Sequence, residues 1–198
     1  DNEHGPNSPR ETYPLITAAC NAGMYPIVRV GKLDDITIQR TLDLGVAGVQ
    51  IPQIQSGADA AKARMYSKYA PLGKRGVCRY VMPADGGLKD RNDYFAEQND
   101  VTVIIHIEGK EGVDAFDDIV KEDGIDIIFI GPNDLSQSLG VLGQVEHPKV
   151  IGAIEEIVEK CRANGKHAGV FCDSVDAVKR YKDLGIKYIS ISVDVGIF

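Results

Sequence analysis

The chain has 198 residues, of which 43% are hydrophobic and 26% are charged, and its formal net charge is −7. These values are typical of a globular protein with a hydrophobic core, and they disfavour a protein that binds nucleic acid through a basic face. No run of 18 apolar residues occurs, so no membrane-spanning segment is predicted. The four cysteines form no CxxC pair and no signal peptide is evident, which indicates reduced thiols in a cytoplasmic protein.

One pattern recurs along the chain: a helical segment ends at a glycine, and a short apolar run follows within a few residues. Glycine adopts the left-handed conformation after a helix at little cost, so it reverses the chain there. The β-branched runs that follow are typical of buried strands. Strands are predicted in this way at residues 26–30, 46–51, 101–107, 125–130, 168–171 and 188–193.

Several helix starts agree with this division. Ser8 and Glu11 form a capping box with a proline at the first helical position. Pro148 opens a helix that extends to Arg162, and Ser174 can cap a helix that extends to Leu184. Residues 70–95 are rich in glycine and proline, and we expect them to form a long loop after a strand, placed over the active site.

Alternating helices and buried strands predict a parallel sheet with helices outside it. The two candidate folds are a doubly wound sheet and a TIM barrel. No GxGxxG motif follows a strand and no P-loop is present, so the sequence favours the barrel. The chain also lacks an initiator Met, and we interpret it as a (β/α)8 barrel that is incomplete at both termini and forms one domain over residues 1–198.

The carboxyl ends of parallel strands meet at the mouth of a barrel, where catalysis occurs. Polar residues gather at these predicted ends: Arg29, Gln50, Gln53, His106, Glu108, Asn133, Asp134, Cys172, Asp173 and Asp194. Because an apolar barrel has no structural need for so many polar groups at one rim, the set indicates a functional site.

Glu108 and Asp134 are the most informative pair, because they follow consecutive predicted strands. Neighbouring carboxylates repel unless a proton or a cation lies between them. Mg²⁺ or Mn²⁺ binds one or two carboxylates and leaves its other positions to water and substrate. The alternative is that Glu108 pairs with Lys110 while Asp134 caps the turn at residues 135–138, and the sequence leaves both interpretations open.

Arg29 interrupts an apolar run, and a buried arginine almost always needs a partner. It could bind a carboxylate or an enolate oxygen, or it could form a structural ion pair inside the barrel. His4 alone is weak evidence of function, since a histidine near a chain end is usually solvated. No lysine lies inside the predicted strands, which disfavours catalysis through a Schiff base.

Six segments carry a resemblance to a known family. In chain order they are DNEHGPN (1–7), PIVR (26–29), LDLG (42–45), KYAPLGKRG (68–76), HIE (106–108) and IGPNDLS (130–136). Together they resemble the HpcH/HpaI family of class II pyruvate aldolases, over nearly the whole chain. The resemblance implies a barrel, usually a hexamer, with a divalent metal (Mg, Mn or Co) and no covalent intermediate.

The resemblance also implies roles for individual residues. Glu108 and Asp134 would be the metal ligands. The segment from Pro132 to Asp134 would hold the substrate carboxylate through backbone N–H groups around Asn133 and Asp134. His106 would lie in the substrate pocket, where the family usually has glutamine. Three further residues would serve the reaction: Arg29 would stabilise the enolate oxygen, and His4, supported by Asp43, would serve the acid and base steps.

The reaction that this implies is reversible cleavage of a 4-hydroxy-2-oxo acid to pyruvate and an aldehyde, in a homo-oligomer. Two alternatives remain: a lyase for citryl- or malyl-CoA, which would need a basic site for the adenine phosphates, and a silent assembly subunit. Asp43 is awkwardly placed for a partner of His4. It ends a helix, at the opposite face of a barrel from the mouth, so the pair must form between subunits or Asp43 is structural.

Overall fold

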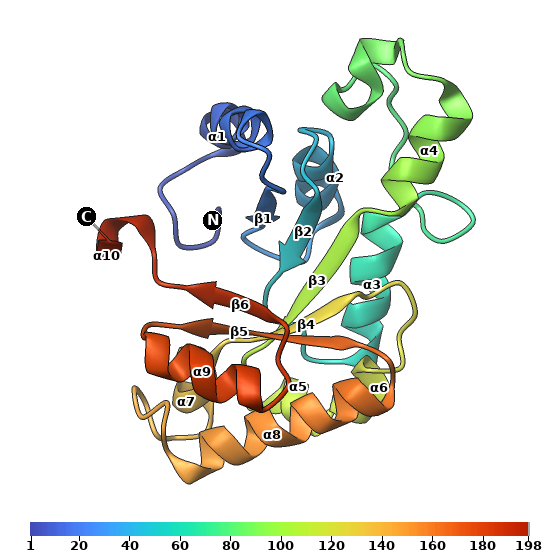
Figure 1. Cartoon of the computed structure of the whole chain (residues 1–198). Helices are drawn as coiled ribbons and strands as arrows, with labels where there is room; N and C mark the ends of the chain where they lie inside the picture. The colour runs from blue at the N-terminus through green and yellow to red at the C-terminus, as the bar shows by residue number, and fades with distance from the viewer. Residues whose placement is uncertain (198) are drawn as a thin grey trace. The chain divides into compact units, whose positions relative to one another are not determined.

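A computed structural model describes residues 1–197 of the chain, which has an α/β fold (Figure 1). Six strands are hydrogen-bonded in chain order in one parallel sheet. Their bounds are β1 (Ile27–Arg29), β2 (Gly48–Ile51), β3 (Thr102–Ile107), β4 (Ile127–Ile130), β5 (His167–Cys172) and β6 (Tyr188–Ile191). All six predicted strands are therefore confirmed, and each boundary differs from the prediction by at most two residues.

The strand order separates the two candidate folds. A doubly wound sheet reverses its strand order at a switch point. Among the described strands the order rises from β1 to β6 without reversal, which is the order that a barrel requires. The parallel α/β architecture is thus confirmed, whereas closure into an eight-stranded barrel stays a prediction.

Ten α-helices and one 3₁₀ helix accompany these strands within residues 1–197. They are α1 (Pro9–Asn21), α2 (Asp35–Leu42), α3 (Gly57–Ser67), η1 (Met82–Gly87), α4 (Arg91–Asn99), α5 (Lys110–Asp114), α6 (Phe116–Ile119), α7 (Pro132–Ser138), α8 (Pro148–Ala163), α9 (Val175–Asp183) and α10 (Asp194–Ile197).

The predicted helix starts are confirmed by their hydrogen bonds. The Glu11 carboxylate accepts hydrogen bonds from the backbone N–H and the hydroxyl of Ser8, and these bonds hold the pKa of Glu11 below its usual value. The Ser174 hydroxyl accepts a hydrogen bond of 3.2 Å from the N–H of Ala177 at the start of α9. Helix α8 begins at Pro148, as its sequence predicts.

The prediction for residues 70–95 is wrong. This segment follows α3 and leads into β3, so it connects a helix to the amino end of a strand instead of following a strand. It also contains η1 and the start of α4, where Asp90 accepts hydrogen bonds from the N–H groups of Asn92 and Asp93. Two of its residues, Ala84 and Tyr94, are buried and pack together with Tyr69, which directly precedes the segment. Its glycines and prolines suggested a loop, but a cap and a small hydrophobic core give it structure.

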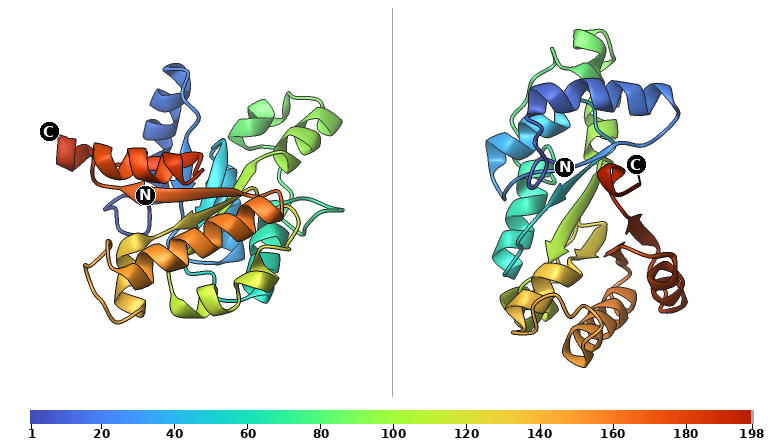
Figure 2. Two further views of the ribbon diagram at one scale, coloured as in Figure 1. Left: turned by 60° about the horizontal axis from the view of Figure 1, so that its bottom comes forward. Right: turned by 90° about the vertical axis from the view of Figure 1, so that its left-hand side faces the viewer.

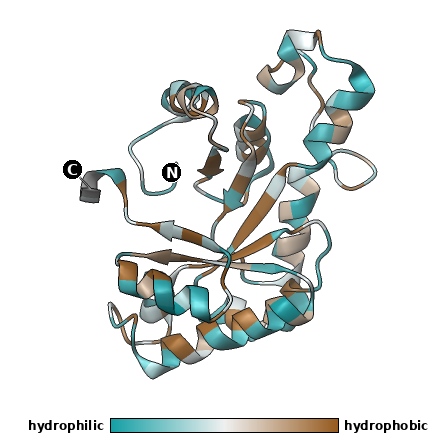
Figure 3. Ribbon diagram, viewed as in Figure 1, coloured by the Kyte–Doolittle hydropathy of each residue, from teal (hydrophilic) through white to brown (hydrophobic). Residues whose placement is uncertain are grey.

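The described residues form two compact units. The first comprises residues 1–52 with 61–104, and the second comprises residues 53–60 with 105–197. In the second unit, α8 and α9 lie along β5 (Figures 1 and 2). The side chains that α8 buries are apolar: Val150, Ile154, Ile157, Val158 and Cys161. Figure 3 shows hydrophobic bands, in brown, along this helix. The assignment of residues 1–198 to a single domain stays a prediction.

No helix within residues 1–197 is long and apolar enough to cross a membrane.

Two glycines give a matched test of packing. A Cβ atom on Gly48 would lie 2.7 Å from the carbonyl oxygen of Thr102 and 2.8 Å from Cδ1 of Ile27, so β2 has no room for a side chain there. Gly48→Ala should lower the free energy of unfolding by about 1–3 kcal/mol. Gly152 lies in α8 with nothing within 4 Å of such an atom, so Gly152→Ala should raise it by about 0.5–1 kcal/mol.

Urea denaturation of both variants and the wild type measures these changes. A Gly48→Ala protein as stable as the wild type would contradict the close approach of β2 to its neighbours.

Candidate active site

The carboxylate of Glu108 is held at both of its oxygens. Glu108 directly follows β3 and is 8% exposed. Its Oε1 accepts a hydrogen bond of 2.9 Å from the backbone N–H of Gln53, and its Oε2 lies 3.1 Å from Nδ1 of His106. Gln53 has a φ of 58°, which is unfavourable for a residue with a side chain. Strained backbone of this kind persists where surrounding contacts fix it, and it is frequent at functional sites.

The carboxylate of Asp134 faces the same glycine as that of Glu108. Strand β4 ends at Ile130, Gly131 follows, and Asp134 lies in the first turn of α7. A Cβ atom on Gly131 would lie 3.0 Å from Glu108 Oε2 and 3.8 Å from Asp134 Oδ2. Both carboxylates therefore border a space that any side chain at position 131 would fill.

The competing interpretation of Glu108 is wrong. Lys110 pairs with Asp114, four residues further along α5, and both side chains are exposed. Glu108 instead has the buried contacts described above. The expected capping role of Asp134 is also wrong, because α7 begins at Pro132 with Gly131 as its N-cap and no side chain caps it. Asp134 lies inside the first turn, where the helix dipole favours a carboxylate.

The donor set around Gly131 fits a hard divalent cation. Carboxylate oxygens are the ligands that Mg²⁺ and Mn²⁺ prefer, and such ions commonly bind only one or two of them. Within residues 1–197, no group of three or more His, Cys, Asp or Glu side chains is arranged to hold a metal. A cation at Glu108 and Asp134 would thus take its remaining ligands from water and substrate, unlike a closed structural zinc site.

Arg29 lies in the first unit and is surrounded by acidic side chains from the start of the chain. Its Nε donates a hydrogen bond of 2.8 Å to Asp1 Oδ1, and its Nη2 bonds to Asp1 Oδ2. Its Nη1 lies 3.1 Å from Glu3 Oε2. The alternative interpretation of Arg29, an ion pair, is therefore present, while its binding of an enolate oxygen stays a prediction. Since a guanidinium has five N–H donors, these three contacts use only part of its capacity to donate.

His4 and Asp43, expected to act together, have different neighbours in the chain. His4 is exposed, and its Nε2 lies 3.9 Å from Glu3 Oε2. Asp43 Oδ1 accepts a hydrogen bond of 2.7 Å from Nη2 of Arg75, whose guanidinium lies over the ring of Tyr69 at 4.7 Å. Within the described part of one chain, the two residues do not pair. The ion pair with Arg75 is what a structural role of Asp43 would give, and an Asp43–His4 contact between subunits stays a prediction.

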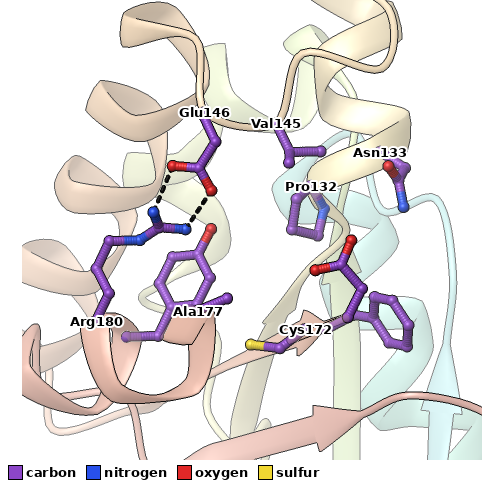
Figure 4. A pocket seen from close by; sticks show the side chains of 10 residues that line it. Pro132, Asn133, Val145, Glu146, Cys172, Ala177 and Arg180 are labelled. Atoms are coloured by element: carbon purple, nitrogen blue, oxygen red, sulfur yellow. Dashed lines mark hydrogen bonds and ion pairs between the residues drawn. The ribbon is translucent and has the colours of Figure 1, made fainter. Parts of the chain in front are cut away.

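A small cavity borders the start of α7. It is lined by Pro132 and Asn133 together with Cys172 and Asp173, and the ion pair between Glu146 and Arg180 lies at its side (Figure 4). Its volume of about 30 Å³ is enough to admit water. Burial and the neighbouring Asp173 carboxylate raise the pKa of the Cys172 thiol, so this cysteine stays protonated and is a poor nucleophile.

Four contacts of these residues were not anticipated from the sequence. Asp1 and Glu3 could have been found, because they are the acidic residues beside His4 and an arginine inside a strand needs such partners. Arg75 could have been chosen only by knowing that the segment before β3 packs on the end of α2. The contact from the N–H of Gln53 could not be predicted from the sequence, since any residue except proline supplies a backbone donor.

Comparisons with known proteins identify relatives of this chain by sequence and by fold. The 5-keto-4-deoxy-D-glucarate aldolase of Enterobacter sp. (strain 638) is 34% identical over 199 residues, which cover 100% of this chain and 77% of that protein. A crystal structure of an HpcH/HpaI aldolase/citrate lyase family protein from Burkholderia cenocepacia matches with a TM-score of 0.93 and 32% identity, over 98% of this chain and 78% of that one.

The crystal structure of the citrate synthase SbnG matches with a TM-score of 0.88 and 30% identity, over 100% of this chain and 76% of that chain. The sequence profile of the HpcH/HpaI aldolase/citrate lyase family spans residues 1–198. By sequence and by structure, therefore, the chain belongs to the HpcH/HpaI aldolase/citrate lyase family.

Proposed function

We propose that the protein is a divalent-metal-dependent aldolase that reversibly cleaves a 4-hydroxy-2-oxo acid to pyruvate and an aldehyde. The observation that carries this proposal is the pair of carboxylates, Glu108 and Asp134, that border Gly131. Family membership and the names of the aldolase relatives support the reaction class. The relatives act, by name, on 5-keto-4-deoxy-D-glucarate, which makes a hydroxylated sugar acid the first substrate to assay.

Glu108 and Asp134 would hold the cation. When bound, it would act as a Lewis acid toward the 2-oxo group and so favour the enolate form of the product. Backbone N–H groups around Asn133 and Asp134, at the first turn of α7, would receive the carboxylate of the substrate. Pro132, the first residue of α7, is buried and fixes the start of this turn. His106, which contacts Glu108, would lie in the substrate pocket.

Two residues of the first unit, His4 and Arg29, would take part in the step that breaks the carbon–carbon bond. A base removes the proton of the hydroxyl on C4, the bond between C3 and C4 breaks, and its electron pair becomes the enolate of pyruvate. We assign the proton transfers to His4. Arg29 would donate hydrogen bonds to the enolate oxygen, with its orientation set by Asp1 and Glu3. Protonation of the enolate at C3 then completes the reaction.

The first test is an aldol assay of pyruvate with a panel of aldehydes. Excess chelator should abolish activity, and Mg²⁺, Mn²⁺ or Co²⁺ should restore it. Glu108→Gln should lower kcat/KM by at least about 100-fold, because a neutral amide binds a hard cation weakly. Glu111→Gln is the matched control: this acidic residue is exposed in the neighbouring helix α5, and its replacement should leave activity unchanged. Full activity in excess chelator would refute the proposal.

A second prediction concerns Arg29. Arg29→Lys keeps the positive charge but loses the planar fork that binds Asp1 and an enolate oxygen together. We expect kcat to fall by about 100- to 1000-fold, the usual cost of removing a donor to a developing oxyanion. Circular dichroism should show that the fold survives. Near-normal turnover in this variant would mean that Arg29 serves only as the partner of Asp1 and Glu3.

We also propose that the protein acts as a homo-oligomer, a hexamer by family resemblance, in which Asp43 of one subunit supports His4 of another. The support is that these side chains have different partners within one chain.

This proposal predicts complementation between inactive variants. His4→Ala and Asp43→Asn should each be nearly inactive alone. Mixed subunits should recover part of the wild-type rate, because some interfaces then combine an intact His4 with an intact Asp43. Steady-state assays of mixtures, with sedimentation to measure assembly, provide the check. An active monomer, or mixtures no better than the separate variants, would contradict the shared site.

A further inference from the structure

His106 and Glu108 belong to one face of β3 and its continuation. They are two residues apart, and alternate residues of a strand point to the same side. Both side chains are nearly inaccessible to solvent, at 2% and 9% exposure, and His106 Nδ1 lies 3.1 Å from Glu108 Oε2. A hydrogen bond between an imidazole and a buried carboxylate is stronger than one at the surface, because no water competes for either group.

Packing fixes the orientation of the His106 ring. The imidazole stacks on Phe129 of β4, with ring centroids 4.7 Å apart and an angle of 25° between the planes. Phe129 in turn meets the edge of Tyr188 of β6, at 5.7 Å and 71°. A ring held between strands in this way presents Nδ1 to Glu108 in one direction only.

Glu108 is thereby fixed from two sides. The Gln53 N–H binds Oε1 while His106 binds Oε2. Each carboxylate oxygen has about two lone-pair positions, so an oxygen that accepts one hydrogen bond can also bind a cation. Oε2 is the oxygen that lies 3.0 Å from the Cβ position of Gly131, on the side where Asp134 also lies. The contact with His106 therefore orients the oxygen that a cation beside Asp134 would use.

We propose that His106 is a positioning residue for the cation: its Nδ1–H holds Oε2 of Glu108 in the orientation that binds the metal. This inference rests on the proposed function, because it assumes a cation at Glu108 and Asp134. Hydrogen bonds to metal-ligating carboxylates typically change metal affinity 10- to 100-fold when they are removed. His106 thus acts on cation affinity, in addition to the place in the substrate pocket that the family resemblance implies for it.

The competing explanation is that His106 only fills space beside Phe129. Two substitutions separate packing from hydrogen bonding. His106→Phe keeps an aromatic ring to stack on Phe129 but donates no hydrogen bond. His106→Asn loses the ring but keeps an N–H donor close to the position of Nδ1. If His106→Phe does not fold, His106→Met replaces it, since methionine also fills the space flexibly without a donor.

The experiment is calorimetric titration of the full chain with Mn²⁺, without substrate, so that binding is measured independently of turnover. We expect His106→Phe to raise the Kd by about 10- to 100-fold, and His106→Asn to stay within about threefold of the wild type. Thermal denaturation with and without Mn²⁺ gives a second measure: the shift in Tm that the metal produces should shrink in His106→Phe and persist in His106→Asn.

The outcomes distinguish this inference from the function on which it rests. If the wild type binds Mn²⁺ and His106→Phe binds it equally well, the positioning role is wrong while the metal-dependent aldolase stands. Equal weakening in both variants would assign the effect to the ring and also overturn the role of the donor. If the wild type binds no Mn²⁺, both the inference and the proposed metal dependence fall.

Discussion

Two carboxylates that border one small space repel each other unless a proton or a cation lies between them, and the candidate site in the second unit depends on this constraint. Glu108 and Asp134 reach the space from the ends of β3 and β4, and Gly131 keeps it open by having no side chain. The protein restrains the more buried carboxylate with hydrogen bonds from Gln53 and His106, which lower the cost of its charge but do not cancel it. A cation between the two carboxylates would remove the remaining repulsion and bind tightly for that reason.

Arg29 has the opposite environment to these two neighbouring carboxylates, because it is a cation that contacts acidic side chains from the start of the chain. Asp1 and Glu3 surround a single guanidinium, so the local net charge there is negative although Arg29, the proposed donor to an enolate, is positive. Such an arrangement fixes the direction of the remaining N–H donors, at the cost of some of the attraction for an anion. In both units, then, charged side chains are held by neighbours before any substrate arrives, which is the preorganisation that electrostatic catalysis needs.

Much of this arrangement follows from local sequence, and some of it does not. The six described strands could be predicted from β-branched runs, most of which follow a helix that ends at a glycine. Both signals act within a few residues of sequence. Glu108 and Asp134 were chosen together because consecutive parallel strands end at the same edge. The segment before β3 was misassigned, since its composition does not reveal that Asp90 starts a helix or that Tyr69 and Tyr94 pack together. The partner of Asp43 was missed because Arg75 is 32 residues away in sequence.

The bond between Gln53 and Glu108 joins residues 55 positions apart, and the second unit takes residues 53–60 from a part of the chain that is otherwise in the first. The order of folding is therefore constrained. Residues from 105 onward cannot complete the surroundings of Glu108 until the chain has closed a loop through the whole intervening segment. The entropy of closing it amounts to roughly 3–4 kcal/mol on the (3/2)RT ln n scale. In a fragment that begins at Ile105, Glu108 would lack the hydrogen bond from the N–H of Gln53.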